Sequence, residues 1–136
     1  MPAGARAGML RGVRCLIVDD NELFLQEARE LLDREGIDVL DVARTTAEAC
    51  EKIAQLRPEL TLVDIDLGGE SGFDVVRALA AEPGPNTRVI LISVHAHSDF
   101  EDLIRASAVA GFVSKSELSA RAIHNVLGSE AGPAPG

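Results

Sequence analysis

Two kinds of hydrophobic pattern alternate along the chain. Short unbroken apolar runs, typical of buried strands, are followed by longer stretches in which apolar residues return every three or four positions, as in amphipathic helices. The runs predict five strands, at 14–19, 37–43, 60–64, 87–93 and 112–114. Because strands that alternate with helices form a parallel sheet covered on both faces, the pattern predicts an α/β fold with a doubly wound five-stranded sheet.

The expected helices are bounded by residues that start or stop a helix. Thr45 and Ser98 each stand three residues before a glutamate, which is the form of a capping box. Gly36 and Pro58 end the first two helices. The five helices are expected over 21–35, between 45 and 58, between 71 and 83, from 98 onward, and over 117–127.

The composition is that of one soluble domain. The chain has 136 residues, of which 46% are hydrophobic and 3% aromatic, so the core is expected to be aliphatic. Residues 1–13 and 128–136 are rich in glycine, alanine and proline and are expected to be a disordered lead-in and a flexible tail around a domain at 14–127.

Charge and hydropathy exclude several classes of function. The net charge of −9 argues against direct binding to nucleic acid or to an anionic membrane. Neither a signal-peptide core nor an apolar run of about 20 residues occurs, so no membrane insertion is expected. Cys15 and Cys50 could form a disulfide on parity alone, but buried thiols in a reducing cytoplasm are the favoured interpretation.

Polar residues follow four of the predicted strands. Asp19 and Asp20 come after the first strand, Asp64 ends the third, Ser93 ends the fourth, and Lys115 follows the fifth. Because the carboxyl ends of parallel strands meet at one edge of a sheet, these side chains are expected to converge. Carboxylates, a hydroxyl and an ammonium together suit a divalent cation and a phosphoryl group.

Four sequence motifs in this order resemble the receiver domain of two-component response regulators. They are the acidic pair at the end of 16–20, the central segment 58–67, the strand end 91–93 and the segment 111–115. None is specific alone, but together they cover about 14–127. The resemblance implies a flavodoxin-like (βα)5 fold with strand order 2-1-3-4-5.

The resemblance also implies a chemical role for the acidic residues. Asp64 would accept a phosphoryl group from a sensor histidine kinase or a phosphotransfer protein. Asp19 and Asp20 would hold Mg²⁺, or Mn²⁺, together with Asp64 and the backbone carbonyl of Asp66. The domain would then be no enzyme beyond its own phosphorylation and dephosphorylation, and it would act in the cytoplasm.

Three further residues are implied to sense the phosphoryl group. Ser93 and Lys115 would contact it, and Phe112 stands at the position of a rotating aromatic residue, with a plain core aromatic that never rotates as the alternative. The surface formed by the helix after 98, the strand 112–114 and the helix 117–127 would then change shape. That surface would bind a downstream protein or a second copy of the chain.

Departures from the usual receiver pattern affect the loops around the site. Gly68 stands where proline is common, which predicts a looser loop. Ser116 follows Lys115 where a cis proline is common, which predicts a trans bond and a repositioned last helix. Val94 follows Ser93, where a smaller residue is common, and its bulk is expected to hinder water from reaching the phosphoryl group and so to slow dephosphorylation.

Asp66, Val94 and His95 are candidates for tuning hydrolysis. His95 and His97 alternate on a loop without an evident third protein ligand, so a transition-metal site there is not favoured.

Alternative functions are weighed by the order of the motifs. The segment 64–68 resembles the nucleophile loop of haloacid-dehalogenase-like phosphatases, but in those enzymes the acidic pair comes after the lysine. A phosphorylation-independent interaction module with a receiver fold is a second alternative. No helix-turn-helix follows Leu127, which favours a stand-alone receiver over the receiver part of a DNA-binding regulator, and the latter interpretation stays open.

Overall fold

The computed structural model describes residues 12–81, 86–94, 101–106 and 108–131. The expected lead-in before residue 12, His95, the capping box at Ser98 and the last residues from 132 onward lie outside the described residues. Among the described residues, no helix is both long and apolar enough to cross a lipid bilayer.

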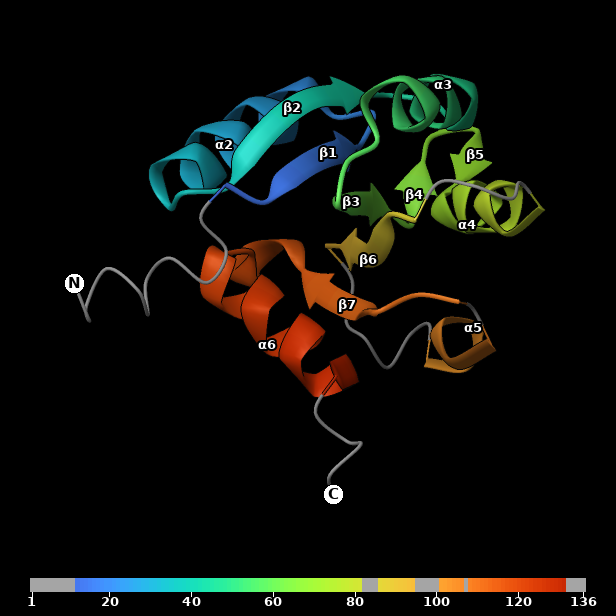
Figure 1. The fold of residues 1–136 in the computed structure, drawn as a ribbon. Coiled ribbons are helices and arrows are strands. Elements are labelled where there is room, and N and C mark those ends of the chain that lie inside the picture. The colour runs from blue at the N-terminus through green and yellow to red at the C-terminus, as the bar shows by residue number, and fades with distance from the viewer. Residues whose placement is uncertain (1–11, 82–85, 95–100, 107, 132–136) are drawn as a thin grey trace.

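Five parallel strands form the central sheet, in the order β2-β1-β3-β6-β7 (Figure 1). Their bounds are β1 (Arg14–Val18), β2 (Asp38–Ala43), β3 (Leu60–Asp64), β6 (Arg88–Ser93) and β7 (Gly111–Ser114). Because β6 and β7 are the fourth and fifth strands of the sheet in chain order, the predicted order 2-1-3-4-5 is confirmed.

Helices cover both faces of this sheet (Figure 1). Helices α2 (Glu22–Arg34) and α6 (Ala120–Ala131) bury their apolar side chains in one cluster, against one face of the sheet. Helices α3 (Thr46–Leu56), α4 (Gly72–Ala81) and α5 (Glu101–Ala106) build a second cluster on the opposite face. The predicted doubly wound α/β architecture is therefore confirmed. Both clusters are mainly aliphatic, as the composition predicts.

The helix boundaries follow the capping signals of the sequence. Asn21 Oδ1 accepts the Phe24 N–H at 3.1 Å and starts α2, and Gly36 beyond its end has φ 95°. At α3, Thr45 Oγ1 accepts the Glu48 N–H at 3.1 Å. The Glu48 carboxylate reaches back to the Arg44 N–H at 2.6 Å, one residue earlier than in a standard capping box.

The loop expected after β3 is instead a short β-hairpin. Strands β4 (Asp66–Leu67) and β5 (Glu70–Ser71) pair in antiparallel fashion around Gly68 and Gly69. Gly68 has φ 77°, a conformation that residues with a side chain rarely adopt, so a glycine at this first turn position allows a two-residue turn. The loop predicted to be looser is therefore ordered by backbone pairing.

The last helix begins and ends later than predicted. A 3₁₀ turn, η3 (Lys115–Glu117), follows β7, and α6 begins at Ala120, where Ser119 Oγ accepts the Ala122 N–H at 3.0 Å. The helix continues beyond Leu127 because a single glycine inside a helix costs only about 1 kcal/mol. No cis peptide bond occurs among the described residues, so the bond between Lys115 and Ser116 is trans, as predicted.

The two cysteines are not joined by a disulfide. Cys15 is buried in β1, and Cys50 on α3 is half-buried. Burial raises the pKa of the Cys15 thiol far above its ordinary value, which keeps this thiol protonated and unreactive in the folded protein.

The start of α4 approaches the end of β3 so closely that only glycine fits. The Gly72 N–H donates to the carbonyl of Ile65 at 2.8 Å, and a Cβ atom at Gly72 would overlap the backbone carbonyl of Asp64. By contrast, a Cβ atom at Gly69 would meet no atom within 4 Å.

We expect Gly72→Ala to lower the free energy of unfolding by about 2–3 kcal/mol, because helix and strand must separate to admit the methyl group. Urea denaturation followed by circular dichroism measures this change. Gly69→Ala, in the same segment, is the matched control and should stay within about 0.5 kcal/mol of the wild type. Equal effects of the two substitutions would contradict the proposed close contact.

Candidate functional site

The parallel sheet brings the predicted polar residues to one edge. Asp19 follows β1, Asp64 ends β3, Ser93 ends β6, and Lys115 follows β7. Asp19 is fully buried, while Asp64 and Ser93 are 5% and 1% exposed. Asp20, in contrast, is exposed. The predicted residues therefore share one edge of the sheet, where Asp19, Asp64 and Ser93 are buried and Asp20 is exposed.

Three carboxylates are clustered in this site. Asp19, Asp20 and Asp64 each have an oxygen within 4.8 Å of the others. Apart from its contact with Lys115, the buried Asp19 Oδ2 has no hydrogen-bond donor among the described residues. Clustered oxygens with an unsatisfied lone pair are the ligand set that a hard divalent cation prefers. The residues present therefore fit a divalent metal ion.

Lys115 partly neutralises this acidic cluster. Its Nζ lies 2.6 Å from Asp19 Oδ2 and 3.0 Å from Asp64 Oδ2, and its side chain is only 10% exposed. Burial alone would lower the pKa of Lys115, but the two carboxylates raise it above its ordinary value. The ammonium group therefore stays charged across the physiological pH range.

Asp64 has the strongest electrostatic perturbation among the described acidic residues. Burial and the charge of Asp19 raise the pKa of the Asp64 carboxyl to about 6, against the opposing influence of Lys115 and of the Asp66 N–H. That N–H donates to Asp64 Oδ1 at 3.1 Å. Asp64 is thus a carboxylate whose charge is only partly compensated by its surroundings, and any added cation would stabilise it.

Comparison with known proteins gives the family. The sequence model of the "Response regulator receiver domain" family matches residues 15–127. The chain belongs to this family. The fold supports the assignment, because the signal receiver domain of NarL from Mycobacterium tuberculosis superposes with a TM-score of 0.76 at 28% identity, covering 90% of this chain and 98% of that one.

Curated relatives of this receiver domain are longer proteins. A protein-glutamate methylesterase/protein-glutamine glutaminase of Myxococcus xanthus is 37% identical over 82 residues, which is 60% of this chain and 23% of that protein. The response regulator GacA of Pseudomonas viridiflava is 28% identical over 104 residues, or 76% of this chain and 48% of that protein. The receiver domain thus spans less than half the length of both relatives.

Three further residues predicted to act in the receiver domain differ in exposure. The side chain of Asp66 is exposed and accepts the Gly68 N–H at 3.0 Å. Val94, directly after Ser93, is 73% exposed. Phe112 is half-buried in β7 and packs against the second core cluster, and its rotation remains a prediction.

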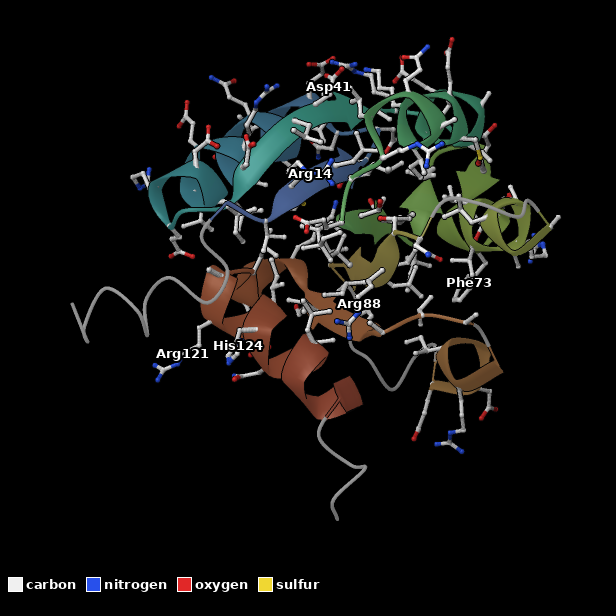
Figure 2. All side chains as sticks on the ribbon, in the orientation of Figure 1. Arg14, Asp41, Phe73, Arg88, Arg121 and His124 are labelled. Atoms are coloured by element: carbon white, nitrogen blue, oxygen red, sulfur yellow. The ribbon has the colours of Figure 1, made fainter. Side chains whose placement is uncertain are left out.

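Of the three histidines, only His124 lies among the described residues. His95 lies outside the described residues. His124 is half-buried on α6, and Figure 2 shows it beside Arg121 on the helix at the opposite side of the sheet from α3 and α4. A phosphotransfer role for His124 is not expected from this position.

Sequence reasoning missed one neighbour of the site in the receiver domain. Phe24, in the first turn of α2, has its ring centroid 4.3 Å from Lys115 Nζ. Its position one helical turn after Asp20 could have indicated that it lies near the carboxyl edge of the sheet. The sequence could not show that Lys115, more than 90 residues later, would lie over this ring.

The raised pKa of Asp64 gives a prediction about stability. Because its folded-state pKa of about 6 exceeds the ordinary value of 3.8, ionisation of Asp64 favours the unfolded chain, and the folded protein loses stability as the pH rises through this range. In metal-free buffer at pH 8, Asp64→Asn should therefore raise the free energy of unfolding by about 1–2 kcal/mol. The gain should shrink between pH 6 and pH 5.

Urea denaturation in EDTA at both pH values measures this difference. Asp66→Asn is the matched control, because that exposed side chain lies outside the buried cluster and its replacement should not stabilise the protein at pH 8. A stabilisation by Asp64→Asn that is equal at pH 5 and pH 8 would rule out the electrostatic explanation.

Proposed function

We propose that Asp64 accepts a phosphoryl group from a phosphohistidine of a sensor histidine kinase or a phosphotransfer protein, in a Mg²⁺-dependent reaction. The observation that carries this proposal is the buried cluster in which Asp64 lies beside Asp19 and 3.0 Å from the ammonium group of Lys115. Family membership supports it, because receiver domains of two-component systems are phosphoacceptor modules.

Asp19, Asp20 and Asp64 would hold the metal ion, together with the backbone carbonyl of Asp66. Mg²⁺ suits this oxygen set, and Mn²⁺ is an acceptable substitute. When bound, the ion would reduce the electrostatic repulsion between the phosphoryl oxygens and these carboxylates. Gly68 leaves room for this arrangement, since a Cβ atom there would lie 3.0 Å from Asp20 Oδ2.

The chain's own residues supply the nucleophile and the charge around it. A carboxylate oxygen of Asp64 attacks the phosphorus, the bond from phosphorus to the donor imidazole nitrogen breaks, and the imidazole takes up a proton. Lys115 pairs with one phosphoryl oxygen, and the Ser93 hydroxyl donates to another. Hydrolysis of the acyl phosphate then returns Asp64 to its carboxylate form.

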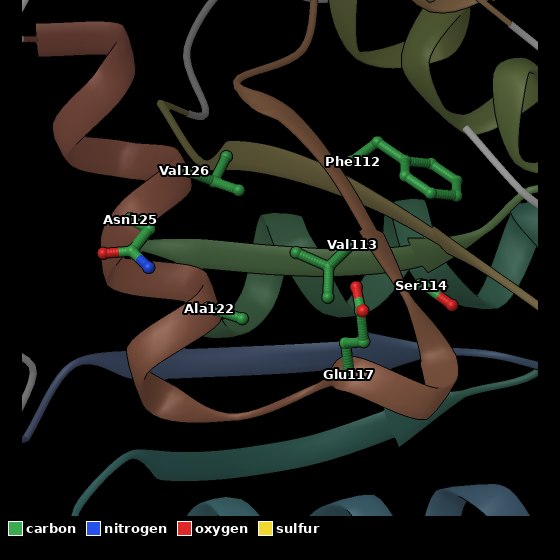
Figure 3. Close-up of a pocket in the computed structure, with 7 residues that line it drawn as sticks. All are labelled: Phe112, Val113, Ser114, Glu117, Ala122, Asn125 and Val126. Carbon is green, nitrogen blue, oxygen red and sulfur yellow. The ribbon is translucent and has the colours of Figure 1, made fainter. Parts of the chain in front are cut away.

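Phosphorylation would act on the surface formed by α5, β7 and α6. A groove of about 550 Å³ lies along β7 and α6, and Figure 3 shows Phe112 on β7 and Asn125 on α6 among its lining residues. Movement of Ser93 toward the phosphoryl group would let Phe112 change its packing and reshape this groove. A downstream protein or a second copy of the chain would bind there.

The domain would have no catalytic activity other than its own phosphorylation and dephosphorylation. The name of the methylesterase relative describes the whole of that protein, and this chain matches only 23% of it. The acidic pair precedes Asp64 in the chain, unlike the order in haloacid-dehalogenase-like phosphatases. The net charge of −9 supports a protein partner over direct contact with nucleic acid.

The first test of the proposed function is the intact mass of the protein after incubation with Mg²⁺ and phosphoramidate. The wild type should gain one phosphoryl group, and Asp64→Asn should gain none. If a folded wild type that binds Mg²⁺ gains none, a phosphorylation-independent interaction module becomes the better interpretation. Lack of Mg²⁺ binding would refute the site itself.

Val94 should slow the loss of the phosphoryl group. Its exposed side chain follows Ser93 and would restrict the approach of water to the phosphorylated Asp64. We expect Val94→Ala to shorten the half-life of the acyl phosphate severalfold, measured by the decay of the phosphorylated mass after removal of phosphoramidate. Leu23→Ala, at another exposed apolar residue, is the control and should leave the half-life unchanged.

A further inference from the structure

Lys115 rests on an aromatic ring as well as between two carboxylates. Phe24 lies in the first turn of α2, half-buried, and its ring centroid is 4.3 Å from Lys115 Nζ. An ammonium group within about 6 Å of a ring centroid is attracted by the negative face of the ring, and the attraction is larger where water is excluded. With the Lys115 side chain 10% exposed, this contact is largely shielded from water.

The contact completes a closed set of interactions among four residues. Asp19 Oδ1 accepts the Asn21 N–H at 2.8 Å, and Asn21 Oδ1 accepts the Phe24 N–H at 3.1 Å. Lys115 Nζ then joins the Phe24 ring to Asp19 Oδ2, which is 2.6 Å away. The backbone of Phe24 is thus held by the capping residue Asn21, which is itself bonded to Asp19.

We propose that Phe24 is a positioning residue that holds the ammonium group of Lys115 in place for the incoming phosphoryl group. This inference rests on the proposed function. A lysine side chain is flexible, and the present partners of Lys115 are the two carboxylates that a metal ion and a phosphoryl group would engage. The face of Phe24 is the partner that stays unchanged in that event.

A neutral ring suits this role for a simple electrostatic reason. A carboxylate in its place would attract Lys115 more strongly, but would compete with the phosphoryl oxygens and repel them. An aliphatic side chain would fill the same space without attracting the ammonium group. The ring therefore restricts the position of Lys115 without adding negative charge to a site that already contains three carboxylates.

A purely structural role for Phe24 is the competing explanation. Phe24 also packs against the core cluster that contains Leu32, which is eight residues further along α2 and about 12 Å away along the helix axis. Leu32→Ala therefore weakens the same helix and the same cluster at a distance from Lys115. This variant therefore shows how a loss of stability alone changes the phosphorylation rate, with the ammonium group of Lys115 undisturbed.

The experiment compares Phe24→Leu, Phe24→Tyr and Leu32→Ala with the wild type. Three quantities are measured: the rate constant of phosphorylation by phosphoramidate at saturating Mg²⁺, the Kd for Mg²⁺, and the proton chemical shifts of the Lys115 side-chain methylenes. Phe24→Leu should lower the rate constant about tenfold, leave the Kd for Mg²⁺ within about twofold and abolish the ring-current shift of Lys115.

The controls have defined outcomes. Phe24→Tyr retains the ring face and should keep both the rate constant and the ring-current shift close to those of the wild type. Leu32→Ala should lower stability and leave the rate constant unchanged at a temperature where the variant is folded. If Phe24→Leu does not fold, Phe24→Met, which keeps most of the side-chain volume, takes its place with the same expected result.

The inference is overturned if Phe24→Leu is phosphorylated at the wild-type rate, or if its rate constant and Mg²⁺ affinity fall together as in a general loss of structure. In either case the proposed function of Asp64 stands. If the wild type itself gains no phosphoryl group, the proposed function and this inference both fail. The two failures are therefore distinguishable.

Discussion

The burial of two carboxylates beside one ammonium group is the constraint around which the carboxyl edge of the sheet is organised. Asp19 is fully buried, Asp64 is 5% exposed, and Lys115 pairs with both. Charges buried in this way cost free energy unless they are compensated, and one lysine does not fully compensate two carboxylates and the nearby Asp20. The site is therefore electrostatically unfavourable as it stands, and a cation would relieve it.

The rest of the molecule supplies the stability that this edge lacks. Two aliphatic clusters, one on each face of the sheet, surround the strands that carry the charged residues. The hairpin β4–β5 and the close contact of Gly72 with the end of β3 restrict the backbone around Asp64. The site is consequently held by rigid elements, and its charge can change while the backbone around it stays ordered.

The same arrangement explains how a local charge could act at a distance. Ser93 and Lys115 lie at the ends of β6 and β7, and β7 also carries Phe112, which lines the groove beside α6. A group bound at the edge of the sheet therefore contacts the strands that shape the proposed partner surface. This coupling needs two packings of similar free energy, as any switch between binding states does.

The sequence by itself determined the strands, their order through family resemblance, and the acidic and basic residues at their ends, because hydrophobic periodicity and strand-end polarity are local properties. It did not predict the hairpin at Gly68 or the late start of α6, since these depend on backbone pairing and on capping at Ser119. Only the tertiary structure decided that Phe24 lies under Lys115. Two residues more than 90 positions apart meet because the strands are parallel, so that the segments after β1 and β7 lie at the same carboxyl edge of the sheet, and no local pattern records that contact.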